Sequence, residues 1–173
     1  MKTKVSFWLI PSAEDRAFFQ GIIDTLSQEY DAPGFTPHVT IYSGEFAPDE
    51  SAASLIEKAT QEVKPFSLNV DKLLYSDEFT KTLFVQFQPS VILSKISEII
   101  RSNSLKPSSF VLNPHLSLIY KQMDEATKKK LTNSLTLTRS EVVFNEVKAI
   151  FTPEKVQSRA DVESWKVICA SKL

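Results

Sequence analysis

The two histidines of this 173-residue chain stand in two similar short stretches. His38 lies in FTPHVTIYSG and His115 lies in LNPHLSLIYK, so each follows a proline and precedes an aliphatic residue, a hydroxyl-bearing residue and a second aliphatic residue. An imidazole titrates near neutral pH and can therefore act as a general base or, once protonated, as a general acid. A matched pair of this kind predicts proton-transfer chemistry rather than two unrelated structural histidines.

Each motif also places a hydroxyl on the same side of a strand as its imidazole. Side chains alternate between the faces of a β-strand, so His38 and Thr40 point one way, and His115 and Ser117 share a face in the same manner. Two facing imidazoles suit in-line displacement at phosphorus, in which one deprotonates the attacking water and the other protonates the departing alkoxide. The hydroxyls donate hydrogen bonds to the non-bridging oxygens. The near-identical motifs leave open which imidazole is the base and which is the acid.

This chemistry requires neither a metal ion nor another cofactor. The two histidines lack the additional cysteines or spaced carboxylates of a zinc site, so we expect no metal. The chain has three glycines, none of which forms a glycine-rich phosphate loop, so phosphate binding is expected from imidazoles, hydroxyls and main-chain amides. The lysine run at 128–130 is interpreted as a solvated helix face rather than an RNA-binding patch.

The motifs need strands that carry them to one place, and the sequence predicts the same series of elements twice. The series is strand, helix, strand, helix, strand, which gives an internal repeat at about 3–76 and 81–151, followed by a closing strand at 163–171. His38 and His115 are 77 residues apart and occupy matching positions in the two units. Two such β-α-β-α-β units, related by a pseudo-twofold axis, each deliver one histidine to a central groove. We therefore predict an α+β fold.

The whole chain, residues 1–173, is expected to form a single globular domain. Twenty lysines and arginines against 21 aspartates and glutamates leave a net charge of −1, which argues against the broad basic field that binds long nucleic acids. The single cysteine, Cys169, cannot form an internal disulfide. The start of the chain carries no long apolar run, so we expect neither a signal peptide nor a membrane span, and the predicted location is the cytoplasm.

At its two motifs, HVTI and HLSL, the chain resembles the 2H phosphoesterase family, and the resemblance is strongest to the cyclic phosphodiesterase branch. It extends over nearly the whole chain through the segments FWLIP, FTPHVTIYSG, NPHLSLIY, MDEATKKK and VESWKVI. The resemblance implies a bilobal α+β fold in which antiparallel sheets flank a groove, and metal-independent opening of a cyclic phosphate. The four catalytic positions of the family are matched by His38, Thr40, His115 and Ser117.

The resemblance further implies aromatic residues along the substrate pocket. Trp8 and Tyr120 match such positions, and Phe84 is a weaker match; an indole at the rim of the groove stacks on a base or adenine ring. The other interpretation of Trp8, and of Phe84, is core packing. Strict alternation places Tyr42 on the catalytic face but Tyr120 on the opposite one, so either the strand bends or ends before Tyr120 or that side chain is structural.

Together with the resemblance, these observations predict an enzyme that hydrolyses a nucleoside 2′,3′-cyclic phosphate or ADP-ribose 1″,2″-cyclic phosphate to a phosphomonoester. The alternatives are a phosphodiesterase for 2′,5′-linked oligonucleotides or RNA ends, a nucleotide-binding module without catalysis, and a scaffold with two buried structural histidines. The expected partners are a small nucleotide-derived cyclic phosphate and short RNA or oligonucleotide ends, with no membrane contact. The chain is expected to be a monomer.

Overall fold

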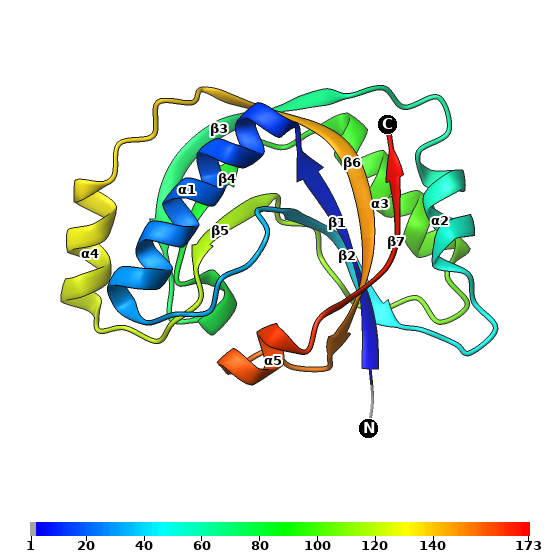
Figure 1. The fold of residues 1–173 in the computed structure, drawn as a ribbon. Coiled ribbons are helices and arrows are strands. Elements are labelled where there is room, and N and C mark those ends of the chain that lie inside the picture. Colours follow the sequence, from blue (N-terminus) through cyan, green and yellow to red (C-terminus); the bar gives the residue numbers. More distant parts are fainter. Residues whose placement is uncertain (1–2) are drawn as a thin grey trace.

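The computed structural model describes residues 3–173 and confirms the predicted α+β class. The element order is strand, helix, strand, helix, strand, then the same series again, then a short fifth helix and a closing strand (Figure 1). The strands are β1 (Thr3–Pro11), β2 (Val39–Glu45), β3 (Phe66–Tyr75), β4 (Leu83–Phe87), β5 (His115–Ile119), β6 (Glu141–Pro153) and β7 (Lys166–Lys172). The helices are α1 (Ala13–Tyr30), α2 (Ala52–Ala59), α3 (Val91–Asn103), α4 (Glu125–Ser134) and α5 (Arg159–Glu163), with a 3-10 turn, η1 (Phe79–Lys81), before β4.

The strands pair antiparallel and close into a ring. Around the ring the order is β1, β2, β5, β4, β3 and β6, and β6 pairs again with β1, while β7 adds to β6. The contact between β2 and β5 consists of one residue pair, Val39 with Leu116, and β3 meets β6 over four pairs. These two short junctions divide the ring into two lobes. One lobe is built on β2, β1, β6 and β7, and the other on β5, β4 and β3.

Neither lobe is made from one predicted unit alone. The last strand of the first unit, β3, pairs with β4, and the last strand of the second unit, β6, pairs with β1. The helices are exchanged as well, because α1 contacts β5, whereas α3 packs on α2 and contacts β2 (Figure 1). The repeat boundaries at 3–76 and 81–151 stay a prediction. None of the helices in residues 3–173 combines the length and the apolar character that a membrane span requires.

Most helices begin where the sequence offers a hydrogen-bonding cap. The side chains of Ser51, Ser90, Asp124 and Ser158 each accept a hydrogen bond from the main-chain N–H three residues later. Ser12 holds the same position before α1, but its side chain makes no cap bond. Local hydrogen bonding therefore fixes where four of the helices start.

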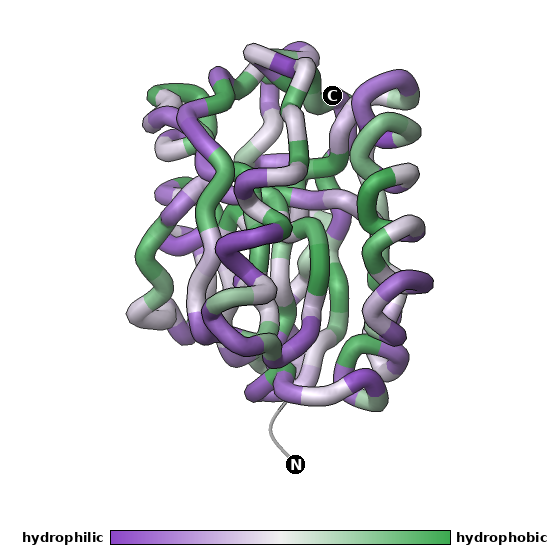
Figure 2. The backbone as a smooth tube through the Cα atoms, turned by 90° about the vertical axis from the view of Figure 1, so that its left-hand side faces the viewer, coloured by the Kyte–Doolittle hydropathy of each residue, from purple (hydrophilic) through white to green (hydrophobic). Residues whose placement is uncertain are grey.

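The core anchors the strands that carry the motifs. Hydrophobic and polar residues alternate along the strands and the helices keep one apolar face, as the banded colouring in Figure 2 shows. At the junction of β2 and β5, the aliphatic residues of both motifs are fully buried, with Val39, Ile41, Leu116 and Leu118 all 0% exposed. Because these side chains are fixed on the core side, the residues between them face the space between the lobes.

Candidate active site

The two histidine motifs meet where the two lobes touch. In the junction pair, Val39 with Leu116, each aliphatic residue directly follows the histidine of its motif. Since both aliphatic side chains point into the core, their neighbours in the chain point the other way, into one groove between the lobes. This groove is lined by the four predicted catalytic side chains, His38, Thr40, His115 and Ser117.

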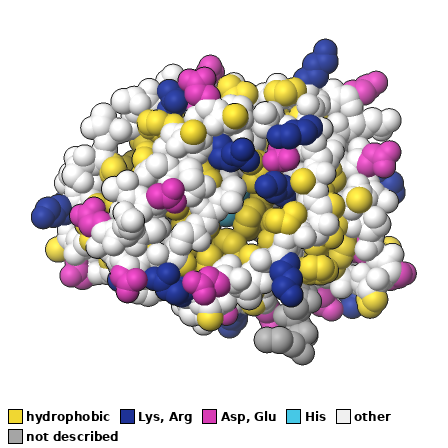
Figure 3. Space-filling view, in the orientation of Figure 1, with side chains coloured by type: hydrophobic (Ala, Val, Ile, Leu, Met, Phe, Trp, Pro, Cys, Tyr) yellow, Lys and Arg dark blue, Asp and Glu magenta, His cyan; other side chains and the backbone are white. Residues whose placement is uncertain are grey.

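The groove is small, with a cavity volume of about 220 Å³. Figure 3 shows a hollow between the lobes in which a patch of histidine surface is surrounded by hydrophobic side chains. A larger hollow of about 690 Å³ lies between α2 and β7, but neither histidine lines it. The chemistry of the lining side chains, rather than the volume, therefore selects the smaller groove as the active-site candidate.

The main chain fixes the tautomer of both imidazoles. The Nδ1 atom of His38 lies 2.7 Å from the carbonyl oxygen of Thr36, and the Nδ1 atom of His115 lies 2.7 Å from the carbonyl oxygen of Asn113. A carbonyl oxygen accepts hydrogen bonds and cannot donate them, so Nδ1 carries the proton in each ring. In the neutral ring, Nε2 therefore keeps the lone pair that a general base needs.

An aromatic ring on the neighbouring strand supports each imidazole. Trp8 of β1 stacks on His38 with the ring centroids 3.6 Å apart and the planes inclined by 11°. Phe84 of β4 meets His115 edge-on, with centroids 5.4 Å apart and an angle of 73°. In each lobe the aromatic residue pairs with the hydroxyl residue of the adjacent motif. The two supports are thus equivalent in position and different in geometry.

Burial shifts both imidazoles towards the neutral form. His38 is 8% exposed, and its pKa is lowered to about 4, mainly because burial disfavours the charged ring. The hydrogen bond to the Thr36 carbonyl raises this pKa, and the charge of His115 lowers it further. Burial also lowers the pKa of the half-buried His115. The hydrogen bond to the Asn113 carbonyl raises this pKa, the charge of Lys81 lowers it, and the charge of Glu78 raises it. The two imidazoles therefore differ in burial and in the charges beside them, with a cation and a carboxylate near His115 and neither near His38 among the described residues.

The two motif hydroxyls differ in their hydrogen bonds. The Ser117 hydroxyl donates to the carbonyl oxygen of Thr80 over 2.6 Å. Within residues 3–173 the hydroxyl of the half-buried Thr40 has no hydrogen-bond partner. If both hydroxyls are to donate to a phosphate, the hydrogen bond from Ser117 to the Thr80 carbonyl must break first, whereas the Thr40 hydroxyl can donate directly.

A β-bulge follows the hydroxyl residue of the first motif and redirects the next tyrosine. Against β1, β2 carries one extra residue, Ile41, so that Tyr42 pairs with Phe7. Tyr42 therefore points into the core, where it is 2% exposed and its hydroxyl accepts a hydrogen bond from the Ser108 N–H over 2.8 Å. The prediction that Tyr42 lies on the groove face and binds substrate is wrong, because the extra residue reverses the alternation.

A second bulge, in β5, has the opposite consequence. Here Leu118 is the extra residue, and β5 ends at Ile119. The shift turns Tyr120 into the groove wall, where its ring stacks on Phe35 with centroids 3.8 Å apart. Burial raises the pKa of the Tyr120 phenol. The strand thus ends before Tyr120, as the first alternative requires, but the ring is 3% exposed and also packs in the core, so a binding role for Tyr120 stays a prediction.

Trp8 and Phe84 do not offer a ring face to a substrate base. Trp8 is 6% exposed, because His38 covers one face and Trp165 packs edge-on with centroids 5.1 Å apart. Phe84 is 4% exposed and lies outside the described groove wall, behind His115. Trp8 lines the groove, as predicted, but its indole is covered instead of lying open at the rim, and Phe84 follows the core-packing alternative. Both rings instead hold the imidazoles in place.

Several groove residues lie outside the motifs and were not predicted. The turn η1 brings Glu78, Thr80 and Lys81 to the side of the groove near His115, and the segment before β7 brings Trp165. A three-residue turn has no periodic pattern that would mark it. Trp165 belongs to the matched segment VESWKVI, but we assigned it to the closing strand.

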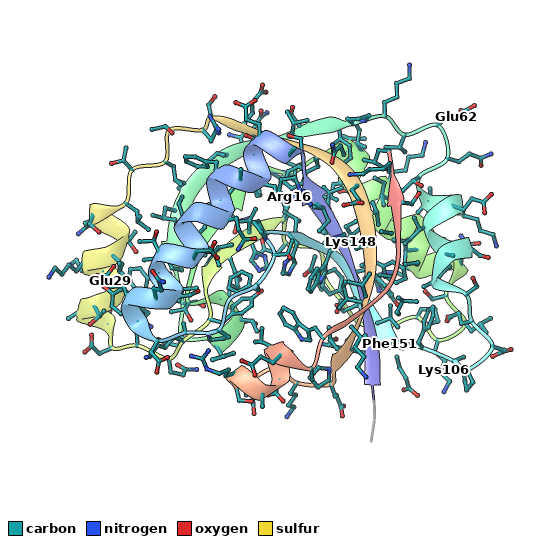
Figure 4. All side chains as sticks on the ribbon, viewed as in Figure 1. Arg16, Glu29, Glu62, Lys106, Lys148 and Phe151 are labelled. Atoms are coloured by element: carbon teal, nitrogen blue, oxygen red, sulfur yellow. The ribbon has the colours of Figure 1, made fainter. Side chains whose placement is uncertain are left out.

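The loop 104–114 adds Phe110 to the groove wall and is held by two cations. The Arg101 guanidinium donates to the carbonyl oxygen of Ser108 over 2.6 Å and also to that of Phe110. Lys106, labelled at the edge of the molecule in Figure 4, lies 3.2 Å from the Glu45 carboxylate. The loop is therefore tied to both α3 and the end of β2.

The described part of the chain offers few metal ligands. Within residues 3–173, no group of three or more histidine, cysteine, aspartate or glutamate side chains is placed to hold a metal ion. The charged side chains of the groove wall are two cations and one anion, Lys4, Lys81 and Glu78. This balance suits an anionic ligand, and the metal-independent mechanism stays a prediction.

The fold is shared with solved structures of other proteins. The structure of E. coli LigT in complex with 3′-AMP matches with a TM-score of 0.61 and 14% sequence identity, over 100% of this chain and 99% of LigT. Kluyveromyces marxianus Usb1 matches with a TM-score of 0.50 and 14% identity, over 96% of this chain and 97% of Usb1. The two-lobed fold and the paired histidine motifs define the class of 2H phosphoesterases.

The sequence comparisons narrow this class. The cyclic phosphodiesterase of Arabidopsis thaliana is 26% identical over 128 residues, which are 74% of this chain and 71% of that protein. A family model described as cyclic phosphodiesterase-like protein matches residues 1–173. The chain belongs to the cyclic phosphodiesterase-like protein family, as the resemblance of its motifs predicted. It is an enzyme, a phosphoric diester hydrolase.

Proposed function

We propose that the enzyme hydrolyses a small, nucleotide-derived cyclic phosphodiester to a phosphomonoester without a metal ion. Nucleoside 2′,3′-cyclic phosphates and ADP-ribose 1″,2″-cyclic phosphate are the proposed substrates. One observation carries the proposal: His38 and His115 line one groove, and each has Nδ1 bound to a main-chain carbonyl and Nε2 left for a substrate. The similarity to an Arabidopsis cyclic phosphodiesterase supports the cyclic substrate.

In the proposed reaction, the phosphorus atom lies between the two Nε2 atoms and water attacks it in line with the leaving ester oxygen. The base imidazole takes a proton from the water as the new P–O bond forms. The acid imidazolium gives its proton to the departing oxygen as the P–O bond of the ring breaks. One water is consumed, the ring opens to a phosphomonoester beside a free hydroxyl, and the two imidazoles exchange protonation states.

We assign His38 as the base and His115 as the acid. The pKa of about 4 keeps His38 neutral across the physiological range. A bound phosphodiester carries negative charge, which raises the pKa of both imidazoles. His115 takes up the proton more readily because it is less buried; the charges of Lys81 and Glu78 act on its pKa in opposite directions, and that of Lys81 is the larger. The different surroundings of the two rings thus support different roles.

Three side chains are proposed to stabilise the charge on the non-bridging oxygens. Thr40 donates its free hydroxyl, and Ser117 donates after it leaves the carbonyl of Thr80. Lys81, on the groove wall, adds a positive charge near His115. Preorganised donors of this kind commonly account for the largest share of catalysis at such centres.

Base recognition is proposed to fall to Trp165 and Phe110 rather than to Trp8. Both are half-buried aromatic residues on the groove wall, so each exposes ring surface that Trp8 lacks. Trp165 packs edge-on against Trp8 and Tyr120, which fixes the orientation of its indole. A base stacked on an aromatic side chain gains about 1–3 kcal/mol.

The test is hydrolysis in the presence of a chelator. We expect the phosphorus NMR signal of a 2′,3′-cyclic nucleotide, or of ADP-ribose 1″,2″-cyclic phosphate, to be replaced by that of a monoester. His38→Ala and His115→Ala are each expected to lower turnover at least about a hundredfold, whereas Lys72→Ala, at an exposed position of β3, leaves it unchanged. Saturable binding without turnover supports the binding-module alternative, and unchanged turnover in either histidine variant contradicts the proposal.

The finer predictions about partners are tested separately. A short RNA that ends in a 2′,3′-cyclic phosphate, added to the same assay, tests whether RNA or oligonucleotide ends are substrates. The near-neutral net charge of −1 favours small substrates over long chains. Light scattering of the purified protein tests the predicted monomer.

A further inference from the structure

The groove continues away from the histidines along one lobe. On β1 the residues that alternate onto the groove face are Lys4, Ser6 and Trp8, and the hydroxyls of Ser43 on β2 and Thr152 on β6 lie beside Ser6. We call Lys4, Ser6, Ser43 and Thr152 the hydroxyl arm. Lys4 lies four positions before Trp8 in the strand, a distance of about 13 Å at roughly 3.3 Å per residue. The arm therefore begins at the histidine site and extends beyond the volume of one phosphate.

The three hydroxyls of the arm form one hydrogen-bonded group. The hydroxyl oxygens of Ser6 and Ser43 are 2.7 Å apart, and those of Ser6 and Thr152 are 3.4 Å apart. Ser6 is 5% exposed and Thr152 is 4% exposed, and Phe151, labelled in Figure 4, marks the part of β6 that carries Thr152. Hydroxyls both donate and accept, and they rotate freely. The group can therefore turn its O–H bonds towards an anionic ligand without breaking the strands.

Lys4 is a partly buried cation without a direct ion pair. Burial lowers the pKa of its ammonium group, and the charge of Glu154 opposes the shift. No carboxylate of residues 3–173 is paired with Lys4 within 4.0 Å. Desolvating a charge costs free energy unless an opposite charge compensates it. On one side of Lys4, Glu45 and Glu154 line an adjoining hollow with it, and on the other side lie the three hydroxyls of the arm. The partly desolvated ammonium thus supplies the positive charge of the arm for an anionic ligand.

The corresponding arm of the other lobe is filled. Thr82, directly before β4, holds the place of Ser6, two residues before the aromatic support, but its hydroxyl donates to the carbonyl oxygen of Lys121 over 2.8 Å. Tyr120 holds the place of Ser43 after the bulge, and its large ring is 3% exposed. One lobe therefore offers an open polar path, and the other closes it. The part of a substrate beyond its cyclic phosphate is directed over β1, β2 and β6.

We propose that the hydroxyl arm binds a second, phosphate-like anionic group of the substrate. The substrate class is then a cyclic phosphodiester that carries a further phosphoryl group, rather than a simple nucleoside cyclic phosphate. Lys4 supplies the positive charge and the hydroxyls supply donors for the several oxygens of a phosphoryl group. This inference rests on the proposed function, because it takes the cyclic phosphate to be bound at the two histidines.

The experiment compares kcat/KM for adenosine 2′,3′-cyclic phosphate with that for the same compound bearing a 5′-phosphate or a 5′-diphosphate. The wild-type enzyme is expected to prefer a phosphorylated form by about tenfold or more, as a charge-assisted contact provides. In Lys4→Met this ratio is expected to fall to about one. Lys72→Met, which removes an exposed lysine from β3, keeps the wild-type ratio. The nearly isosteric Thr152→Val is expected to lower the ratio in part.

Equal kcat/KM values for the three substrates, or a preference that persists in Lys4→Met, would overturn the proposal. If the wild-type enzyme hydrolyses none of them and leaves ADP-ribose 1″,2″-cyclic phosphate intact as well, the proposed function is wrong, and the arm is tested by binding alone. Calorimetry then compares adenosine 3′-phosphate with adenosine 3′,5′-bisphosphate. A preference of about tenfold for the bisphosphate that Lys4→Met abolishes supports the arm, and equal dissociation constants overturn it.

Discussion

The two histidine motifs share one backbone geometry and differ in their surroundings. In both, Nδ1 donates over 2.7 Å to the carbonyl two residues earlier, and a bulge follows the hydroxyl residue. The supports differ, because Trp8 lies flat on His38 whereas Phe84 touches His115 with its edge. The flat stack and the deeper burial enclose the first imidazole more completely than the second.

The remaining contacts extend this difference. Thr40 keeps a free hydroxyl within the described chain, while the Ser117 hydroxyl is bonded to the main chain. His115 lies near two charged side chains, Lys81, which lowers its pKa, and Glu78, which raises it by less, whereas the charge that acts on the more deeply buried His38 is that of His115. Two nearly identical motifs are thus prepared for unlike tasks, and the surrounding residues, rather than the motifs themselves, distinguish a base from an acid.

A substrate whose leaving group needs no proton tests the comparison most severely. With a nucleoside p-nitrophenyl phosphodiester, His115→Ala is expected to lose less than about tenfold in kcat/KM, because p-nitrophenolate departs unprotonated. His38→Ala is expected to lose at least about a hundredfold on this ester as well as on a cyclic phosphate, because water still needs a base. Recovery of His38→Ala, and not of His115→Ala, would reverse the two roles.

The motif hydroxyls give a smaller contrast. Thr40→Val is expected to lower kcat about a hundredfold, the typical effect of losing one preorganised donor. Ser117→Ala is expected to cost about tenfold, since the wild-type hydroxyl first gives up its bond to Thr80. Circular dichroism shows whether both variants remain folded. A larger loss for Ser117→Ala than for Thr40→Val contradicts the assignment of the free donor.

The deeper burial of His38 predicts that the free energy of unfolding depends on pH. The pKa of His38 is about 4 in the folded protein and near 6.5 in the unfolded chain. Above pH 6.5 the ring is neutral in both states, and below it the unfolded chain takes up the proton first, so stability falls as pH falls towards 4. Between pH 7.5 and 5.0 this loss amounts to at most about 2 kcal/mol.

Urea unfolding at pH 7.5 and 5.0 measures that loss. His38→Asn keeps a donor for the Thr36 carbonyl without a titrating ring, and it is expected to remove most of the pH-dependent loss. His115→Asn is the matched variant at the less buried position, and it is expected to remove less. The opposite order of the two variants contradicts the difference in burial.

The chemistry of the site could be predicted because it resides in short, local patterns. The residue types and spacing of the two motifs indicated His38, Thr40, His115 and Ser117, and their buried aliphatic neighbours explain why all four reach one groove. The α+β class followed from the repeated order of strands and helices. The exchange of β3 and β6 between the lobes did not, because strand partners are chosen by tertiary packing rather than by local pattern.

The aromatic residues could not be placed from the sequence because alternation fails at a bulge. A single extra residue, Ile41 in β2, turns Tyr42 into the core, and Leu118 in β5 turns Tyr120 into the groove. No local signal in either motif marks the extra residue. Trp165 was missed for a related reason, since its contact with Trp8 joins segments far apart in the chain.

A crystal structure with vanadate bound in the groove tests the central claim most directly, because vanadate adopts the trigonal bipyramidal geometry of in-line displacement. The account predicts that the Nε2 atoms of His38 and His115 lie within about 3.2 Å of the two apical oxygens, on opposite sides of the vanadium. Vanadate held by one imidazole alone, or bound outside the groove, contradicts the claim that two motifs from distant parts of the chain act on one phosphorus atom.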